Sequence, residues 1–516
     1  MLVNEFLEGS AGRFPGKTAL VCQGRRHTFA DLENSANRFS HALTERGLGR
    51  QDRAAVFLDP SAEAIVSVFA ILKAGGVFLV INPQVKAKKV EYILNDCQVK
   101  ILITDSKHLQ EIAGHLPGCP ELRHLVLVDD KASDPGRGIP TKMATASFAD
   151  IQTNYPASRP PQKCIDIDLA SLIYTSGSTG TPKGVMLTHL NMVSAANSIT
   201  EYLENTPEDI ILNVLPLSFD YGLYQILMAF KFGGTVVQER SFLYLYEVID
   251  QIIKEKVTGF PVVPTIVALL LKLKNLEKYD FSKLRYITNT AQALPPHYIS
   301  EMRRIFPGTK IYSMYGLTEC KRVSYLPPGE IDRRPASVGK AMPNSETFLV
   351  DAEGNRISKP WEIGELVIRG ANVMAGYWNL PQETDKVLKP GLLPGQKVLY
   401  SGDYFKMDEE GFLYFVSRKD DLLKVAGERI SPKEVENSLY DIEGVAEAAV
   451  IGVPDEITGQ AIKAFIALKK GSHLTADEII KWCSKHMESY MVPKFVEFRE
   501  ELPKSSHGKI SKKDLA

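Results

Sequence analysis

Short apolar segments alternate with longer amphipathic ones through most of the chain. The short segments are rich in β-branched residues, as buried parallel strands are, and the longer segments have the apolar spacing of helices. This alternation predicts an α/β fold in which helices cover the sheets. Residues 129–161 have many Pro, Ser, Asp and Gly and weak periodicity, so they are expected to form a surface connection or a long insertion. The expected strands are residues 53–58, 77–81, 101–104, 125–128, 210–214, 235–237, 286–288 and 412–416.

The pattern changes after the last of these strands. A charged stretch at residues 417–421 precedes a new block, in which Ser431 and Thr475 each stand three residues before a glutamate and begin helices as capping boxes. About a hundred residues remain, enough for a small domain. We therefore predict a large N-terminal body of parallel or mixed β-sheets covered by helices, residues 1–419, and a small, mobile C-terminal α+β lid domain, residues 420–516.

The composition excludes several classes of protein. The chain has 516 residues, with 61 Lys+Arg, 62 Asp+Glu and 44% hydrophobic residues, which is typical of a globular protein and not of a disordered or fibrous one. A net charge of −1 counts against nucleic-acid binding, which needs a clustered excess of positive charge. The acidic N-terminus and the lack of a long uncharged apolar span predict that the protein is not an integral membrane protein. The scattered cysteines suit a reducing compartment, so a cytoplasmic location is expected.

A glycine-rich loop follows the apolar segment at residues 172–174. Glycines leave backbone N–H groups free to face phosphate oxygens, hydroxyls add donors, and a lysine adds positive charge, so the loop predicts a nucleotide-phosphate site. It is not a Walker A loop, because Pro182 precedes the lysine and Gly184 follows it. A flexible surface loop is the alternative. The segment is Thr175-Ser176-Gly177-Ser178-Thr179-Gly180-Thr181-Pro182-Lys183-Gly184.

A second motif combines an aromatic ring, a hydroxyl and a carboxylate, groups that suit base stacking and a magnesium-bound phosphate. It is Tyr315-Gly316-Leu317-Thr318-Glu319. A single carboxylate at the end of a strand is nevertheless more often merely solvated. Three further segments are a turn, a charged linker and a basic tail when each is taken alone: Ser401-Gly402-Asp403, Arg418-Lys419-Asp420 and Pro503-Lys504-Ser505-Ser506-His507-Gly508-Lys509.

In this order, the motifs resemble those of the adenylate-forming enzymes, the superfamily of acyl-CoA synthetases, peptide-synthetase adenylation domains and luciferases. The resemblance extends from residues 28–32 to Lys509 and covers nearly the whole chain. Residues 364–366 and 376–378 are also similar to the superfamily and are expected to be structural. One departure concerns the adenine pocket, because residues 290–294 lack the usual Gly-Gly or Gly-Ala turn.

The resemblance implies an ATP site. It implies that Tyr315 packs on adenine, that Thr318 contacts the α-phosphate as a catalytic residue, and that Glu319 is a catalytic residue that ligates Mg²⁺. It places Asp403 on the ribose hydroxyls, as a bidentate acceptor, and Arg418 near the ribose. The other ATP- or AMP-binding residues implied are Thr175, Ser176, Gly177, Ser178, Thr179, Gly180, Lys183 and Gly316.

The resemblance also implies a lid that occupies two positions in turn. Asp420 is the expected hinge, Lys509 the catalytic lysine of the first half-reaction, and Gly427 part of the tunnel for the thiol in the second. A carboxylic acid would attack the α-phosphate of ATP to give acyl-AMP and pyrophosphate, and a thiol would then take the acyl group. The cosubstrates and cofactors implied are ATP, Mg²⁺ and CoA, or the phosphopantetheine of a separate acyl or peptidyl carrier protein.

The acid and the thiol stay open. The expected acyl pocket, Phe219, Asp220, Tyr221 and Gly222, has the Phe-Asp pair of amino-acid-activating members, which favours an amino or otherwise polar acid, although Asp220 could equally cap a helix. Residues 429–436 resemble the acyl-CoA ligase version of the lid, so CoA is the expected acceptor and a carrier protein the second choice. A non-catalytic nucleotide or acyl sensor is the alternative of another class.

Overall fold

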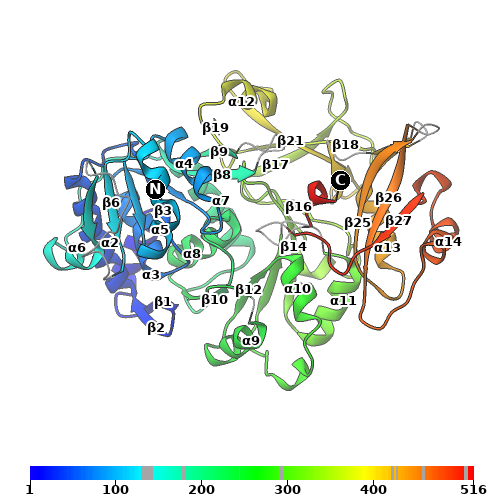
Figure 1. The fold of residues 1–516 in the computed structure, drawn as a ribbon, viewed down its shortest axis with the longest axis horizontal. Coiled ribbons are helices and arrows are strands. Elements are labelled where there is room, and N and C mark those ends of the chain that lie inside the picture. Colours follow the sequence, from blue (N-terminus) through cyan, green and yellow to red (C-terminus); the bar gives the residue numbers. More distant parts are fainter. Residues whose placement is uncertain are drawn as a thin grey trace.

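The computed structural model has the α/β architecture that the sequence predicts, with a large N-terminal body of mixed sheets and helices and a C-terminal domain. Figure 1 shows the body from blue to yellow, with the orange and red C-terminal segments along one side. The structure describes residues 1–129, 143–176, 182–242, 244–290, 294–419, 423–425, 428–455, 459–504 and 510–515.

The first sheet of the body has the strand order β19-β9-β8-β4-β3-β5-β6-β7 in the described ranges. Strands β8, β4, β3, β5, β6 and β7 run parallel, whereas β9 pairs antiparallel with β8 and with β19. The four strands expected between residues 53 and 128 are confirmed apart from small differences at their ends. The bounds are β3 Arg53–Phe57, β4 Val77–Val80, β5 Ile101–Thr104, β6 His124–Leu127, β7 Ala144–Ser147, β8 Leu169–Ser176, β9 Pro182–Thr188 and β19 Gly376–Tyr377.

The second sheet has the order β16-β15-β14-β13-β12-β10-β11-β1-β2 in the part of the chain that the structure describes. Its central strands are parallel, and hairpins extend both edges. The strands expected at residues 210–214, 235–237 and 286–288 are confirmed as β10, β11 and β13. The bounds are β1 Thr18–Cys22, β2 Arg25–Thr28, β10 Ile210–Asn213, β11 Thr235–Gln238, β12 Gly259–Val262, β13 Tyr286–Asn289, β14 Lys310–Tyr315, β15 Ser324–Tyr325 and β16 Lys340–Ala341.

One hydrophobic core joins the two sheets through buried helices. Phe69 of α3 stacks on Phe230 of α8 with ring centroids 5.5 Å apart. The same core contains Ile103 of the first sheet and Val236 of the second, so the sheets and the helices between them form one unit. The helices of the body are α1 Glu5–Arg13, α2 Phe29–Glu45, α3 Ala62–Lys73, α4 Ala87–Asp96, α5 Ser106–Ile112, α6 Phe148–Asn154, α7 His189–Tyr202, α8 Asp220–Phe232, α9 Leu245–Lys254, α10 Pro264–Leu270, α11 Pro296–Ile305 and α12 Pro381–Val387.

The expectation for residues 129–161 is wrong in its described part. Strand β7 adds an edge to the first sheet, and α6 follows it directly. Ser147 caps α6 by accepting a hydrogen bond from the Asp150 N–H, and Phe148 packs edge-on against Phe39 with ring centroids 5.3 Å apart. A short helix with two apolar anchors is too brief for periodicity to reveal it. Residues 130–142 lie outside the described residues.

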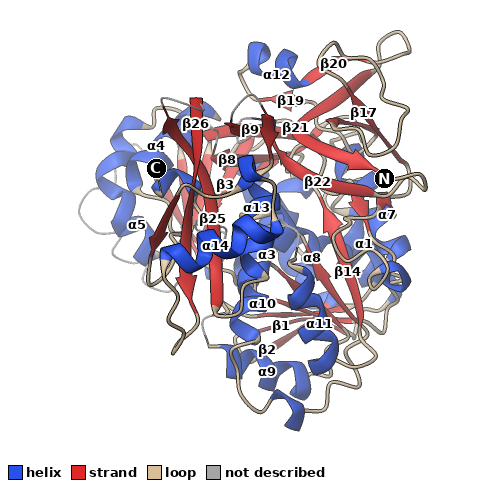
Figure 2. Ribbon diagram, turned by 90° about the vertical axis from the view of Figure 1, so that its right-hand side faces the viewer, coloured by secondary structure: helices blue, strands red, loops and turns tan. Residues whose placement is uncertain are grey.

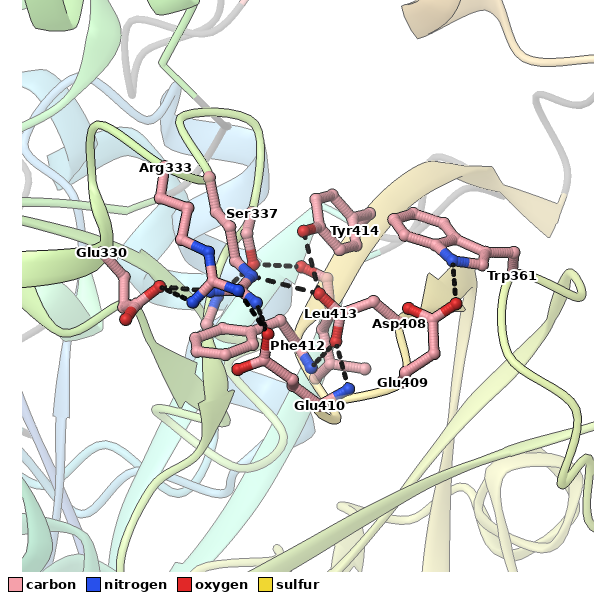
Figure 3. Close-up of polar contacts among 12 residues, drawn as sticks. Glu330, Arg333, Ser337, Trp361, Asp408, Glu409, Glu410, Phe412, Leu413 and Tyr414 are labelled. Carbon is pink, nitrogen blue, oxygen red and sulfur yellow. Dashed lines mark hydrogen bonds and ion pairs between the residues drawn. The ribbon is translucent and has the colours of Figure 1, made fainter.

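A third, antiparallel sheet leads the body into the C-terminal domain. Its hairpin β21–β22 is held by Arg334, whose guanidinium lies 4.1 Å from the ring centroid of Phe412. Figure 3 shows Phe412 with Asp408 and Glu410 of the hairpin, beside Glu330. Arg334 Nε lies 3.2 Å from the Asp408 carboxylate, and the other guanidinium nitrogens pair with Glu330 and Glu410. The hairpin is thus fixed to the segment after β15. The bounds are β17 Ser345–Val350, β18 Gly364–Gly370, β20 Leu388–Pro390, β21 Lys397–Met407 and β22 Leu413–Arg418.

The C-terminal segment has its own sheets and its own core. A core of residues from Leu423 to Met491 forms between β25, β26 and the helices that pack on them (Figure 2). Thr475 forms the predicted capping box with Glu478. Ser431 accepts a hydrogen bond from the Glu434 N–H, but among the described residues the Glu434 side chain does not accept one from the Ser431 N–H. The bounds are β23 Leu423–Val425, β24 Glu428–Ile430, α13 Pro432–Tyr440, β25 Val445–Asp455, β26 Gly459–Leu468, α14 Ala476–His486 and β27 Phe495–Phe498.

The expected domain boundary falls beside residues 420–422, which are outside the described residues, so the division at residue 419 stays a prediction. No helix in the described stretches is both long enough and apolar enough to cross a membrane.

Candidate active site

The loop between β14 and β15 is the centre of the site. The two strands pair antiparallel, with Tyr315 opposite Ser324, so the intervening residues must return in a tight loop. Gly316 is required there, because a Cβ at this position would lie 2.2 Å from the Lys321 carbonyl oxygen. The fold therefore holds the predicted residues Thr318 and Glu319 in one compact turn.

Glu319 contacts the first sheet through a tyrosine. Its Oε1 accepts a hydrogen bond of 2.8 Å from the hydroxyl of Tyr377, which lies on β19. Burial, together with the charge of Glu319, raises the pKa of Tyr377, so its hydroxyl stays protonated and donates. The sequence suggested only a structural role for residues 376–378, and the structure adds a contact to the expected metal ligand.

Lys183 lies on β9 and faces the same tyrosine. Its Nζ is 5.4 Å from the ring centroid of Tyr377 and 2.6 Å from the carboxylate of Glu383, which lies in the first turn of α12. The hydrogen bond from Lys183, with a further contribution from Lys386, lowers the pKa of Glu383 to about 2. Lys183 and Glu319 therefore both contact Tyr377, one over its ring and the other at its hydroxyl, and Glu383 pairs with the lysine.

Asp403 and Arg418 come together on the hairpin that leads to the expected hinge. They are opposite each other in the β21–β22 pairing, with Arg418 Nε 3.7 Å from the Asp403 carboxylate. Tyr315 donates a hydrogen bond of 2.5 Å to Asp403, and its ring packs edge-on against Phe405 at 4.8 Å. Burial, then the charge of Asp403, raises the pKa of Tyr315. The residues predicted for adenine and ribose are thus in direct contact.

Glu365 adds a link that the sequence did not reveal. One oxygen of its carboxylate accepts a 3.2 Å hydrogen bond from the Gly402 N–H, and the other lies 2.9 Å from the ammonium of Lys419. The turn before Asp403 and the residue before the expected hinge are therefore held by the same side chain. The sequence predicted only a structural role for residues 364–366 and did not identify these two partners, which follow Glu365 by dozens of residues.

The predicted acyl-pocket residues lie at the start of α8. Phe219 is the N-cap without a side-chain cap bond, and Asp220 is the first helical residue, so the alternative that Asp220 caps the helix is wrong. Tyr221 donates a 2.8 Å hydrogen bond to the Thr288 carbonyl and so ties α8 to β13. At Gly222 a Cβ would lie 2.4 Å from the Pro216 carbonyl oxygen, so this glycine allows the close return of the chain before α8.

Lys321 is a residue of the site that sequence reasoning missed. It is only 5% exposed, and its Nζ has no hydrogen-bond partner in the described residues. The ammonium lies 5.3 Å from the ring centroid of Tyr224 on α8. Burial lowers the pKa of Lys321 to about 8, and the carboxylates of Asp220 and Glu319 partly oppose that shift. Its burial depends on an aromatic ring about a hundred residues earlier, which no local pattern indicates.

The structure describes only the ends of the predicted glycine-rich loop. Thr175 lies on β8 opposite Lys183, and Ser176, the last residue of β8, pairs in the backbone with Pro182. Other predicted site residues lie outside the described residues: Gly177, Ser178, Thr179, Gly180, Asp420, Gly427 and Lys509.

Comparison with known proteins identifies the family. The profile of the AMP-binding enzyme matches residues 7–378, and that of the AMP-binding enzyme C-terminal domain matches residues 434–509. The chain belongs to the AMP-binding enzyme family. The predicted membership of the adenylate-forming superfamily is therefore confirmed.

Relatives of this AMP-binding enzyme cover its whole length. A long-chain-fatty-acid–CoA ligase of Bacillus subtilis (strain 168) is 32% identical over 99% of this chain and 94% of that protein. The crystal structure of the anthranilate CoA ligase AuaEII in complex with anthranoyl-AMP matches with a TM-score of 0.90 at 29% identity, over 100% of this chain and 96% of that one. ATP-bound MatB from Rhodopseudomonas palustris matches with a TM-score of 0.88 at 25% identity, over 100% and 98%.

Proposed function

We propose that this AMP-binding enzyme is an ATP-dependent carboxylic acid–CoA ligase. It joins the acid to AMP with release of pyrophosphate and then transfers the acyl group to the thiol of CoA. The observation that supports this most directly is the meeting of three distant segments at one loop: Lys183 and Glu319 face the Tyr377 ring, while Tyr315 bonds to Asp403. A family profile over most of the chain and relatives named as CoA ligases support the same activity.

In this proposal the contacts of the site are redistributed when ATP binds. Lys183 leaves the Glu383 carboxylate for phosphate oxygens, which carry more negative charge, and the glycine-rich loop supplies N–H donors. Asp403 accepts the ribose hydroxyls, with Tyr315 packed at the adenine and Arg418 beside the sugar. Thr318 contacts the α-phosphate. Each group then stabilises charge that grows on phosphate oxygen as the acid attacks.

Glu319 suits a magnesium ion held between protein and phosphate. Mg²⁺ commonly takes one or two carboxylates together with substrate phosphates, and keeps several waters. In the structure Oε1 of Glu319 is occupied by Tyr377, while Oε2 makes no hydrogen bond to another described residue. That oxygen is a suitable ligand, and a bound ion would neutralise phosphate charge at the position where pyrophosphate leaves.

The lid residues complete the proposal. Asp420 is the hinge between a body of residues 1–419 and a lid of residues 420–516, Lys509 serves adenylation, and Gly427 lines the path of the thiol. Lys509→Ala is expected to abolish adenylation while thioester formation from supplied acyl-AMP persists. Lys504→Ala is the matched control, because Lys504 pairs with Glu447 at 2.7 Å in the same tail. Equal loss of both half-reactions in Lys509→Ala would contradict the two-position scheme.

The experiment that tests the function is acid-dependent pyrophosphate release. Fatty, aryl, hydroxy and amino acids are compared, each with and without CoA and with a carrier protein as the alternative acceptor. We expect release with at least one class, acceleration by CoA, and a loss of at least roughly a hundredfold in Glu319→Gln. Glu346→Gln is the control, since Glu346 pairs only with surface arginines in the described residues. Release without acid, or none with any acid, would contradict the proposal.

A further inference from the structure

A buried cation without a partner lies beside the site. Lys321 stands in the loop between β14 and β15 with a backbone φ of +65°, a conformation that non-glycine residues seldom adopt away from turns and functional sites. Its side chain turns inward and is 5% exposed, yet no acceptor among the described residues lies within hydrogen-bond distance of Nζ. A buried ammonium normally has such partners, because desolvation without them is costly.

The start of α8 supplies the opposite charge on the same side. The ammonium of Lys321 lies over the ring of Tyr224, and Tyr224 follows Asp220 by one helical turn, so both point from one face of α8. Asp220 is 9% exposed, and its carboxylate has no hydrogen-bond partner within the described residues. The charge of Asp220 acts on Lys321, but no ion pair joins these two described residues.

Charge balance indicates what could lie between them. The loop and the start of α8 carry two cations, Lys321 and Arg322, and two carboxylates, Asp220 and Glu319. Arg322 lies over the ring of Tyr221 at 5.0 Å, on the same helix. An ammonium on the substrate would satisfy Asp220 but meet Lys321 as a like charge, and a second carboxylate would meet Asp220 in the same way. A neutral group that both donates and accepts satisfies both.

We propose that Asp220 and Lys321 form a subsite for a hydroxyl group of the carboxylic acid. The hydroxyl donates to the Asp220 carboxylate and accepts from the Lys321 ammonium. Since Lys321 is two residues from Glu319 in a tight loop, the hydroxyl belongs on a carbon close to the reacting carboxylate. This inference rests on the proposed acid–CoA ligase function and narrows its substrate to hydroxy acids.

A site built around buried polar groups discriminates strongly against a ligand that leaves them unpaired. An unsubstituted acid of the same length would leave Asp220 and Lys321 without partners, or with a water molecule. We therefore expect the 2-hydroxy or 3-hydroxy acid to be preferred over the unsubstituted acid by at least roughly tenfold in kcat/KM. The 2-amino acid is expected to be the poorest of the set.

The test is pyrophosphate release with CoA for matched unsubstituted, 2-hydroxy, 3-hydroxy and 2-amino acids at short, medium and long chain length. Lys321→Met and Asp220→Asn should each reduce the hydroxy-to-unsubstituted ratio to about one. Lys340→Met is the matched control, because Lys340 also lies over an aromatic ring, 4.4 Å from the centroid of Phe412, but this ring belongs to the β21–β22 hairpin and not to α8. It should leave the ratio unchanged. Melting curves establish that each variant folds. If only one of the two subsite variants folds, its hydroxy-to-unsubstituted ratio is sufficient for the comparison with the wild type.

The outcomes separate the two proposals. Equal use of hydroxy and unsubstituted acids by the wild-type enzyme, with no change of ratio in either variant, would contradict the subsite and leave an ordered water between the charges. Preference for the 2-amino acid, lost in Asp220→Asn, would also contradict it and make Asp220 the partner of an amine. Absence of release with every acid would instead contradict the ligase function itself.

Discussion

Two buried lysines of the N-terminal body differ in the partners of their ammonium groups. Lys73, at the end of α3, has a fully buried side chain whose Nζ lies 2.7 Å from Glu8 of α1 and 2.8 Å from Glu33 of α2. Lys321 is buried to a similar extent, but within the described residues no carboxylate or other acceptor contacts it. The first lysine joins three helices, whereas the second faces an aromatic ring and the start of α8.

The difference separates structure from function. A buried ammonium that has two carboxylates contributes to the fold, and removing it leaves those carboxylates without compensation. A buried ammonium without a hydrogen-bond partner costs stability, so its presence beside the predicted nucleotide motifs supports the proposed ligand. Burial alone therefore does not indicate the role of a charged side chain, whereas the contacts of its charged group do indicate it.

The largest effect on stability is expected for Lys73→Met. The substitution keeps the length of the side chain but removes the cation that Glu8 and Glu33 share, so that Glu33 loses its ion pair and Glu8 keeps only the one with Arg159. This is expected to cost about 3–5 kcal/mol of the free energy of unfolding. Denaturant unfolding of the wild type and the variant measures it. The double variant Lys73→Met/Glu33→Gln should recover part of the loss. A loss below about 1 kcal/mol would show that paired burial does not identify a structural lysine.

His189 is an intermediate case, because only one of its ring nitrogens has a partner among the described residues. Nδ1 accepts a 3.1 Å hydrogen bond from the Val3 N–H, and Nε2 is buried without one. Burial lowers the pKa of His189 from 6.5 to about 4. The unfolded chain therefore binds a proton between these pH values while the folded chain does not, so acidification from 6.5 to 4 removes stability.

That loss amounts to about 3 kcal/mol from this residue. The melting temperature of the wild type should fall over this pH interval by more than that of His189→Gln, which cannot titrate. At neutral pH the two proteins are compared first, so that any constant effect of the substitution is known. If the melting temperatures of the two proteins fell equally over this pH interval, the account of His189 as a neutral side chain in the folded protein would be contradicted.

A smaller effect is expected at the half-buried ion pair of Lys183. In the proposed function Glu383 competes with phosphate for Lys183, so Glu383→Gln should lower the KM for ATP roughly twofold to fivefold, as expected for an ion pair worth up to about 1 kcal/mol. Lys386→Gln is the control, because it removes the other cation that contacts Glu383 and leaves Lys183 held. A rise of KM in Glu383→Gln would show that Glu383 positions Lys183 for ATP instead of competing with it.

The smallest effect on stability is expected for Lys321→Met. The substitution removes a charge that has no hydrogen bond to lose, so the free energy of unfolding should change by less than about 1 kcal/mol or increase. Lys73→Met and Lys321→Met can be compared directly in the same denaturant, because both replace a lysine with a methionine. A loss as large as that of Lys73→Met would contradict the distinction between the two lysines.

The sequence predicts the sheets well where strands are continuous and β-branched. Residues 101–104 match β5, and residues 77–81 match β4 apart from one end. Strand β12 has no such pattern, because Pro261 lacks the N–H of a central strand, yet it pairs between β10 and β13. Tertiary pairing, which a local pattern does not contain, decides its structure.

The candidate site shows the same limit. Motifs that are contiguous in sequence, such as residues 315–319, are found from the sequence because the chemistry is local. Glu383 and Glu365 are not, because each acquires its meaning only from a partner far along the chain, Lys183 and Lys419. Lys321 is adjacent to a motif and was still missed, since its burial depends on Tyr224.

The most direct test of the account follows both products of one reaction. The enzyme is incubated with ATP, Mg²⁺ and an acid that supports pyrophosphate release, first without CoA and then with it, and the nucleotides and thioesters are identified by mass spectrometry. The account predicts that acyl-AMP accumulates first and is converted to AMP and acyl-CoA when CoA is added. Formation of ADP and phosphate, or of a thioester without an adenylate, would contradict it.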